Sequence, residues 1–149
     1  MPDQSERRAD LAAMLHPLFQ ALLAAERRIL ARHEISMWGY SVLSALDGQP
    51  ARSQAALAQS IGADKTRIIG TLDELQDAGY IIREPDPADR RVHLLSVTDA
   101  GQRKCRAAQA DIRAAEEALL AELTPAQRRT FLDVLTTFAD LPLDDILRA

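Results

Sequence analysis

Apolar residues recur at helical spacing near the start of the chain, separated by four, three and four residues. This spacing is typical of one buried helical face, so we expect a long first helix over Glu6–Ala31. A second helix is expected over Met37–Leu46, because Ser36 is a good N-cap and Asp47–Pro50 is rich in residues that stop helices. The apolar face of the first helix consists of Leu11, Leu15, Leu18 and Leu22.

Two short helices joined by only a few residues are expected next. Ser53 can cap the first, which ends near Gln59, and the second starts at Asp64 and runs to about Ala78. Helices joined so closely must cross at a steep angle, and Gly62 suits a turn that needs positive φ. The pattern predicts a helix-turn-helix motif, with an ordinary helical hairpin as the alternative. The residues expected to close its core are Leu57, Ile61, Ile68, Leu72 and Leu75.

A β-hairpin is expected after this motif. Gly79 ends the preceding helix, and residues 80–83 and 92–97 are two apolar runs rich in β-branched side chains. Between them, residues 84–91 form a charged segment. The sequence therefore predicts two strands with a charged tip.

The last third of the chain predicts two more helices. Thr98 can cap a long helix over Asp99–Glu122, and Thr124 followed by Pro125 starts a final one. Pro142 leaves a short tail. The expected fold is mainly α with a small β-hairpin wing, a winged helix-turn-helix between N- and C-terminal helices. Apolar residues at helical spacing in these two helices are Ile112, Ala115, Leu119 and Leu123, then Phe131, Leu132, Leu135 and Phe138.

Length and composition fit one compact domain. The 149 residues include 47% hydrophobic but only 4% aromatic side chains, which favours helix packing. The first ten residues are polar and no apolar run approaches membrane-spanning length, so we expect a cytoplasmic protein with no membrane partner. A single cysteine, Cys105, excludes an intramolecular disulfide, and three scattered histidines predict neither a metal site nor a cofactor.

The charge balance argues mildly against a nucleic-acid partner. The net charge is −4, whereas phosphate binding usually leaves a basic footprint. All 18 basic residues except Lys65 and Lys104 are arginines, which suit phosphate and guanine contacts. No glycine loop for phosphate, nucleophile elbow or metal-ligand set indicates catalysis, so we do not expect an enzyme.

Several motifs together resemble the MarR family of bacterial transcriptional regulators, over nearly the whole chain. The resemblance implies a triangular homodimer in which helices over about 6–31 and 99–141 interleave, with a DNA-binding lobe over about 35–98. It also implies regulation by a small-molecule effector or an oxidant acting between these regions. The motifs are Asp64-Lys65, Leu72-Asp73-x-Leu75, Gly79 and its strand, the tip Asp86-Pro87-Ala88-Asp89-Arg90-Arg91, and Leu95-Ser96-Val97-Thr98-x-x-Gly101.

Two features depart from this family. Gly70 lies midway along the expected recognition helix, where many members carry a polar or basic residue. Either the backbone approaches DNA closely there, or a base contact is missing. Peroxide-sensing members carry a reactive cysteine in the first helix, which here has none.

Exposed residues near the start of the recognition helix are the first candidates for DNA contacts. In helix-turn-helix proteins such residues reach base edges and phosphates. Arg67 can bind guanine through two hydrogen bonds, Thr66 can bind phosphate or base, and Ile69 can contact a thymine methyl. Lys65 and Gly70 complete this set, for which a solvated helix end is the alternative.

The hairpin tip supplies the second group of candidates. Arg91 follows Asp89 by two residues, so both side chains can share one side and the carboxylate can orient the guanidinium. An oriented arginine suits a narrow minor groove, and the family's Asp-x-Arg wing motif maps onto this pair. Arg90 and Ser53 are also predicted DNA contacts. Acids balance arginines over 83–91, so a surface ion pair remains the alternative.

A small-molecule site is predicted on the first two helices, where the family binds ligands. The candidates are His16, Arg27, Trp38 and Tyr40, although a lone tryptophan at helical spacing is more often part of the core. Cys105 is in step with Ala108, Ile112, Ala115 and Leu119 on its helix, which favours a buried packing role over redox sensing.

The sequence thus predicts a sequence-specific DNA-binding transcriptional regulator, a ligand-responsive repressor that binds a pseudo-palindromic operator as a homodimer. The alternative is a winged-helix protein that binds a protein partner or a small molecule without DNA. The acidic net charge and Gly70 favour that alternative.

Overall fold

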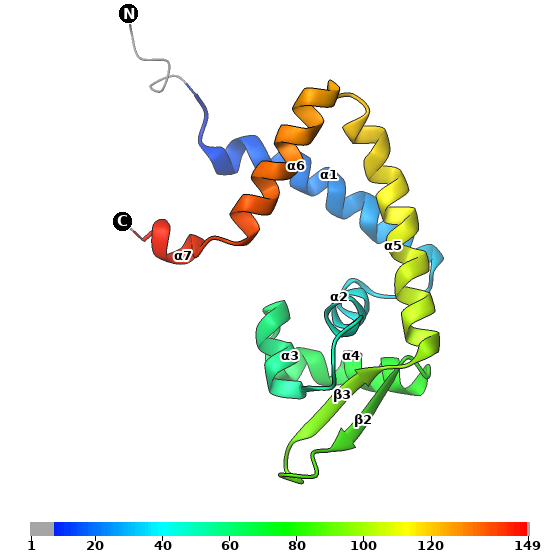
Figure 1. Ribbon diagram of the computed structural model, residues 1–149. Helices are drawn as coiled ribbons and strands as arrows, with labels where there is room; N and C mark the ends of the chain where they lie inside the picture. Colours follow the sequence, from blue (N-terminus) through cyan, green and yellow to red (C-terminus); the bar gives the residue numbers. More distant parts are fainter. Residues whose placement is uncertain (1–7, 149) are drawn as a thin grey trace, which may run out of the picture. The chain divides into compact units, whose positions relative to one another are not determined.

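The computed structural model describes residues 8–148, except for the side chain of Lys65. It divides into two compact units, Met1–Ile112 and Arg113–Ala149. The predicted fold class, mainly helical with a small sheet, is confirmed (Figure 1). The elements are α1 (Leu11–Arg32), α2 (Met37–Leu46), β1 (Arg52–Ser53), α3 (Gln54–Ile61), α4 (Lys65–Asp77), β2 (Ile81–Pro85), β3 (His93–Val97), α5 (Asp99–Leu120), α6 (Pro125–Ala139) and α7 (Leu143–Ile146).

Side-chain caps fix the starts of several helices. The Ser36 hydroxyl accepts a hydrogen bond from a backbone N–H of α2, and Ser53 does the same for α3. The Thr124 hydroxyl accepts from the backbone N–H of Gln127, whose side chain accepts from the Thr124 N–H in return. These caps satisfy N–H groups that have no partner inside the helix, and they confirm three of the predicted N-caps.

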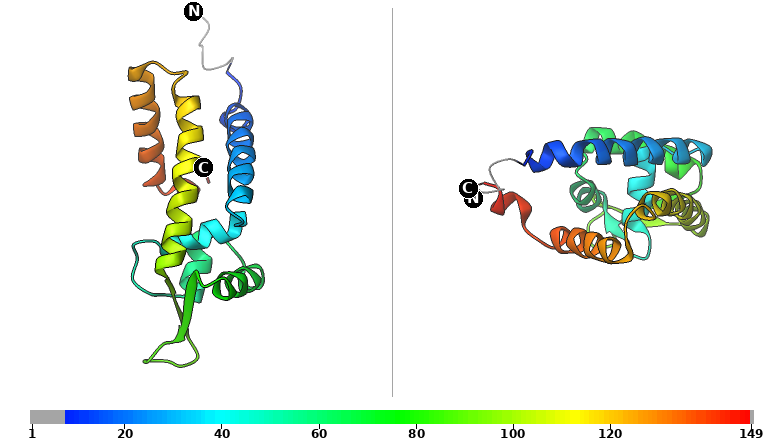
Figure 2. Two further views of the ribbon diagram at one scale, coloured as in Figure 1. Left: turned by 90° about the vertical axis from the view of Figure 1, so that its right-hand side faces the viewer. Right: turned by 90° about the horizontal axis from the view of Figure 1, so that it is seen from above.

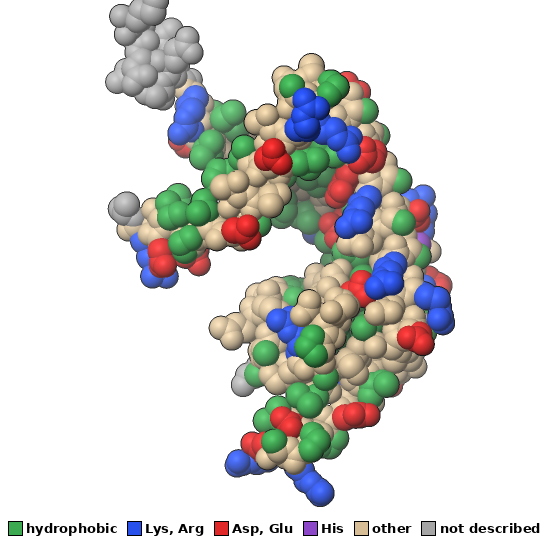
Figure 3. Space-filling view, viewed as in Figure 1, with side chains coloured by type: hydrophobic (Ala, Val, Ile, Leu, Met, Phe, Trp, Pro, Cys, Tyr) green, Lys and Arg blue, Asp and Glu red, His purple; other side chains and the backbone are tan. Residues whose placement is uncertain are grey.

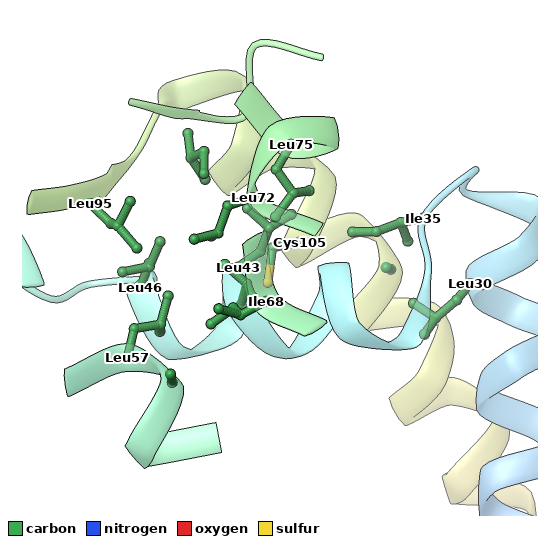
Figure 4. Packing of buried hydrophobic residues seen from close by; sticks show 14 of the residues in the cluster. Leu30, Ile35, Leu43, Leu46, Leu57, Ile68, Leu72, Leu75, Leu95 and Cys105 are labelled. Carbon is green, nitrogen blue, oxygen red and sulfur yellow. The ribbon is translucent and has the colours of Figure 1, made fainter. Parts of the chain in front are cut away.

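The helix-turn-helix is built as predicted. Gly62 ends α3 with φ of 68°, and the N–H of Ala63 donates to the carbonyl of Ala58. This left-handed turn brings α4 in directly behind α3. Four of the five predicted core residues are buried, and Ile61 is only partly so. Figure 4 shows their side chains converging with those of α2 and β3, among them Leu43, Leu46, Leu57, Leu72 and Leu95.

The wing is a three-stranded antiparallel sheet in the order β1-β3-β2. In the hairpin, Ile81 pairs with Val97 and Pro85 pairs with His93, and the hairpin extends beyond the helices of its unit (Figure 2). The third strand was not predicted. Arg52 of β1 pairs with Leu95, so β1 anchors the start of α3 to the sheet.

A close contact attaches α5 to the residues that follow α4. The Thr98 hydroxyl donates to the carbonyl of Gly79 and accepts from the N–H of Gly101. A β-carbon on Gly101 would lie 2.1 Å from the carbonyl oxygen of Tyr80, so only glycine fits there. These contacts give a physical reason for the Thr98-x-x-Gly101 motif.

The first helix differs from its prediction in two ways. It starts at Leu11, so Arg8 and Ala9, which the sequence placed inside the helix, precede it; residues 6 and 7 lie outside the described residues. The predicted apolar face is present but is not buried as expected, since Leu11 is 59% exposed and Leu15 is 53% exposed. Of the leucines on this face, Leu18 and Leu22 are half-buried.

The second unit contains the end of α5 and the helices α6 and α7. Neither α6 nor α7 buries a residue, and most of their apolar side chains are exposed, whereas Phe131 is half-buried. The short helix α7 was missed, because Pro142 was interpreted as the start of a tail whereas it is the N-cap of α7. Among the described helices, none has the length and apolar character needed to span a membrane.

One ion pair connects the two longer helices of this second unit. The Arg128 guanidinium donates two hydrogen bonds to the Glu117 carboxylate, at 2.6 and 2.8 Å. These bonds lower the pKa of Glu117 and raise the pKa of Arg128, because each partner favours the charged form of the other. Both groups are solvent-exposed, so we expect the pair to add little stability.

Candidate nucleic-acid interface

The N-terminal half of α4 presents the predicted residues to solvent. The Asp64 carboxylate caps this helix by accepting from the N–H of Arg67 at 2.8 Å. Thr66 and Arg67 are exposed, and Ile69 is 45% exposed, while Ile68 between them is buried in the core. The side chain of Lys65 lies outside the described part of the chain. The helix therefore turns its buried face to the core and leaves three predicted contact residues accessible.

Gly70 lies on the exposed side of the same helix. A β-carbon built on it meets nothing within 4 Å. Glycine in an exposed helix interior costs about 1 kcal/mol relative to alanine, through the greater backbone freedom of the unfolded chain. Among the described residues, no contact compensates for this cost at Gly70.

Arg83 connects the recognition helix to the wing. Its guanidinium donates to the Gln76 side-chain oxygen at 2.6 Å and forms an ion pair with Asp73. Both partners lie on α4, whereas Arg83 lies on β2. Sequence reasoning counted Arg83 only among the charges of the wing and missed this role. These contacts join β2 to α4.

Two aspartates shape the tip of the wing. The Asp86 carboxylate accepts from the N–H of Ala88 at 2.9 Å. The Asp89 carboxylate accepts from both the backbone N–H and the guanidinium of Arg91, at 3.1 and 3.2 Å. Such local bonds stabilise tight turns. The predicted orientation of Arg91 by Asp89 is thus present in the structure.

The tip is more basic on its outside than its sequence indicates. Asp86 and Asp89 are half-buried, whereas Arg90 is exposed and the Arg91 side chain is 91% exposed. Basic side chains project from the hairpin tip in Figure 3, at the bottom of the view. Positive charge is therefore outermost even though acids and arginines are equal in number over 83–91.

Two shallow hollows connect the recognition helix, the start of α3 and the wing. One includes Ile69 of α4, and the other includes Ser53 and Arg91, so the structure brings these predicted residues to one surface. Gln54 and His93 line both hollows and were missed by sequence reasoning. Only the register of β3 against β2, which is not visible in the sequence, places His93 at this surface. The first hollow is lined by Gln54, Ile69, Gln76, Arg83, Pro85 and His93.

The predicted effector residues lie on α1 and α2. His16 and Arg27 are exposed on α1, and Tyr40 on α2 is partly buried against the core. Trp38 is 37% exposed, so it is not the core residue that its spacing favoured. A small-molecule site at these four residues stays a prediction.

The end of α1 is attached to α5 by polar contacts. The His33 ring lies 2.7 Å from the Asp111 carboxylate, and the Lys104 ammonium donates to the His33 carbonyl, also at 2.7 Å. The same ammonium lies over the Tyr80 ring. His33 therefore has a structural role in this unit, because its side chain and its carbonyl both link the end of α1 to α5.

Cys105 is buried against the core as predicted. Its sulfur lies 3.6 Å from the Ser44 hydroxyl. Burial raises the pKa of the Cys105 thiol, because the thiolate would lose its hydration. A buried thiol with a raised pKa is a poor nucleophile, which supports the packing role. Over the described residues, no three His, Cys, Asp or Glu side chains form a group that could hold a metal ion.

Comparisons with a family model, with curated proteins and with solved structures all indicate the family that the sequence motifs resemble. A MarR family model matches residues 35–92, which include the helix-turn-helix and most of the wing. A MarR family transcriptional regulator from Rhodococcus sp. RHA1 has a similar crystal structure, with 26% identity and a TM-score of 0.77 over 94% of this chain and 97% of that one. Residues 35–92 thus match the MarR family. The fold is therefore the winged helix-turn-helix of that family, as expected.

Two kinds of relative add detail to this MarR-family assignment. The repressor CouR bound to a 23-mer DNA duplex is 28% identical, with a TM-score of 0.76 and coverage of 93% and 96%. CouR from Rhodococcus jostii RHA1 bound to p-coumaroyl-CoA has a TM-score of 0.72, with 28% identity and coverage of 88% and 92%.

A putative regulatory protein for the hcr operon of Thauera aromatica is 33% identical over 97 residues, which cover 64% of this chain and 58% of that protein. The chain thus spans little more than half the length of the first curated relatives it matches.

Proposed function

We propose that the protein is a sequence-specific DNA-binding transcriptional regulator. The observation that carries this proposal is the arrangement of α4 and the wing. Thr66, Arg67 and Ile69 are exposed on a capped helix, and an aspartate orients Arg91 at the tip of a hairpin. A helix of this kind fits the major groove, and an extended arginine fits the adjacent minor groove. The relative CouR, which binds a DNA duplex, supports this function.

The contacts divide into two kinds in this proposal. Arg67 and Thr66 contact base edges, with Ile69 against a thymine methyl, whereas Arg91 and Arg90 enter the minor groove. The residues that line the hollows between them face the intervening phosphates, since a sugar-phosphate strand separates adjacent grooves. The residues proposed for that strand are Ser53, Gln54 and His93.

A homodimer is part of the proposal. Apolar side chains are exposed along α1, and the second unit exposes a further apolar set along α6. Contiguous exposed apolar faces mark sites of association. We infer that residues of about 6–31 and 99–141 form the dimer interface, and that lobes of about 35–98 bind the two halves of a pseudo-palindrome. The apolar set of α6 consists of Leu132, Val134, Leu135 and Phe138.

Repression controlled by an effector is the most specific part of the proposal. CouR is a repressor in one structure and binds p-coumaroyl-CoA in another, which supports a small-molecule effector here. The residues assigned to that effector are His16, Arg27, Trp38 and Tyr40. An effector bound at these residues would favour a conformation that has lower affinity for DNA. This requires the effector to bind that conformation more tightly than the DNA-binding conformation.

The test separates the two arginines. Wild-type protein first selects duplexes from a random-sequence pool, and affinities of Arg67→Ala and Arg91→Ala are then measured on variants of the selected duplex. Arg67→Ala should weaken the binding free energy by about 1 to 3 kcal/mol and relax the base preference at one base pair in each half-site. Loss of Arg91 should weaken binding most on A·T-rich flanks. Arg103→Ala, an exposed change on α5, is the control.

The alternative function is an outcome of the same test. If the wild-type protein selects no sequence, or if both folded variants bind every duplex as wild type does, the proposal is wrong. The interpretation as a winged-helix protein that binds a protein or a small molecule without DNA would then be preferred.

A further inference from the structure

Five of the six glycines have a reason within the fold. Three adopt positive φ, between 68° and 78°, where other residues are strained. A β-carbon on Gly101 would collide with the backbone of Tyr80, and one on Gly39 would lie 3.1 Å from the side chains of Ile35 and Ser36. The glycines with positive φ are Gly48, Gly62 and Gly79.

Gly70 has no such reason. It lies in the middle of α4, is exposed, and has open space where a β-carbon would be. The β-carbon of an alanine there would have no contact within 4 Å among the described residues outside the helix's own backbone, and alanine would stabilise the helix. A requirement for glycine at this position therefore lies in something that binds to this side of α4.

The position of Gly70 on α4 indicates which molecule binds to this side of the helix. On a helix, residues three and four apart share a face, so Gly70 lies beside Thr66 and Arg67 of the preceding turn. One turn later on the same face lies Asp73, which Arg83 links to the wing. Gly70 is thus a gap in the middle of the face that we assign to DNA.

We propose that Gly70 determines specificity by letting the backbone of α4 approach the floor of the major groove. The inference rests on the proposed DNA-binding function. Any side chain at this position would hold the helix away from the base edges and weaken the contacts of Thr66 and Arg67, which are short-ranged. The mid-helix N–H and carbonyl of Gly70 are already used in the helix, so recognition here depends on shape.

The experiment uses a series of side-chain sizes, Gly70→Ala and Gly70→Leu, in the full-length protein. Affinity is measured for the duplex selected by the wild type and for an unselected duplex of equal length, and Tm is measured for each variant. Ala107→Gly is the matched control, because Ala107 is exposed on α5 and the change weakens a helix that makes none of the proposed DNA contacts; sedimentation checks that this variant keeps the oligomeric state of the wild type. This change should lower Tm and leave both affinities unchanged.

We expect Gly70→Ala to raise Tm by a few degrees and to weaken binding to the selected duplex at least about tenfold. Gly70→Leu should reduce that affinity to the level of the unselected duplex. The affinity of both variants for the unselected duplex should stay within about twofold of the wild-type value, since non-specific binding depends on contacts with the charged phosphates.

Two results would overturn the inference. If wild type selects a duplex and Gly70→Ala binds it equally well or better, Gly70 is not a point of close approach and the proposed function stands. If wild type itself selects no duplex, the proposed function fails and the inference fails with it.

Discussion

The helix-turn-helix and the terminal helices use similar apolar residues in opposite ways. In the first, Leu43, Leu57, Leu72 and Leu95 are fully buried in a core formed by α2, α3, α4 and β3. In α6, the apolar residues recur with equal regularity but none is buried. The first region buries its apolar side chains against other parts of the same chain, and the second does not.

This difference indicates where the stability of each region comes from. Burial contributes roughly 25 cal/mol for each Å² of apolar surface removed from water, so the core holds the helix-turn-helix together by itself. An amphipathic helix with its apolar face in water gains little from that face. We therefore expect α6 to depend on association, and each prediction below tests this contrast.

The largest effect is expected on the exposed face. Leu135 and Phe138 lie three residues apart on α6, and both are more than 40% exposed. Replacing both by aspartate should abolish the dimer, because two buried charges without partners cannot be accommodated in an interface. Binding to the selected duplex should weaken by at least about 100-fold, since the two half-sites are then no longer bound together. Sedimentation and a binding titration measure the two effects.

The control for this double variant is Thr136→Asp, an exposed polar position on the same helix. It should remain a dimer with unchanged affinity. A double variant that stays dimeric would show that this face of α6 is not the interface, and the contrast between the two regions would then lose its basis.

An intermediate effect is expected at Cys105, in the buried region. Cys105→Ala should cost about 1 kcal/mol through lost packing, with the dimer and DNA affinity unchanged. The raised pKa leaves little thiolate near neutral pH, so an aromatic disulfide reagent should react with the native thiol far more slowly than with the unfolded chain. Urea unfolding and the time course of thiol modification measure these effects. Rapid modification of the native protein, with loss of DNA binding, would identify a redox sensor instead.

The smallest effect is expected at the exposed pair of Glu117 and Arg128. The pKa of Glu117 is lowered in the folded state, so its contribution is present above the ordinary glutamate range and is lost as the pH falls through the folded pKa. Glu117→Gln should therefore lower Tm slightly at neutral pH, with the difference from wild type vanishing in acid. Glu122→Gln is the exposed control. A difference that grows in acid would contradict this assignment.

The sequence was most informative where a single residue type controls a local event. Ser36, Ser53 and Thr124 cap helices as predicted, and Gly62 forms the left-handed turn. These effects depend only on neighbours within a few residues, so they are visible in the sequence. The orientation of Arg91 by Asp89 is also local and was predicted for the same reason.

What the sequence did not reveal depends on contacts between distant segments. The two-residue strand β1 exists only because Arg52 pairs with Leu95, and it is too short to show a periodic pattern. The link from Arg83 to Asp73 and the position of His93 also depend on how the wing packs. The first helix shows a further limit, because periodicity identifies an apolar face but not whether the same chain covers it.

The contact between Gly101 and Tyr80 also affects how mutations in this gene would be classified. A substitution at Gly101 collides with backbone, so such alleles should be recessive losses of protein abundance. In the proposed homodimer, alleles at Gly70 should instead yield normal amounts of protein that still pairs with wild-type subunits, and they should be dominant in a cell that carries both alleles. The two glycines would thus fall into opposite genetic classes.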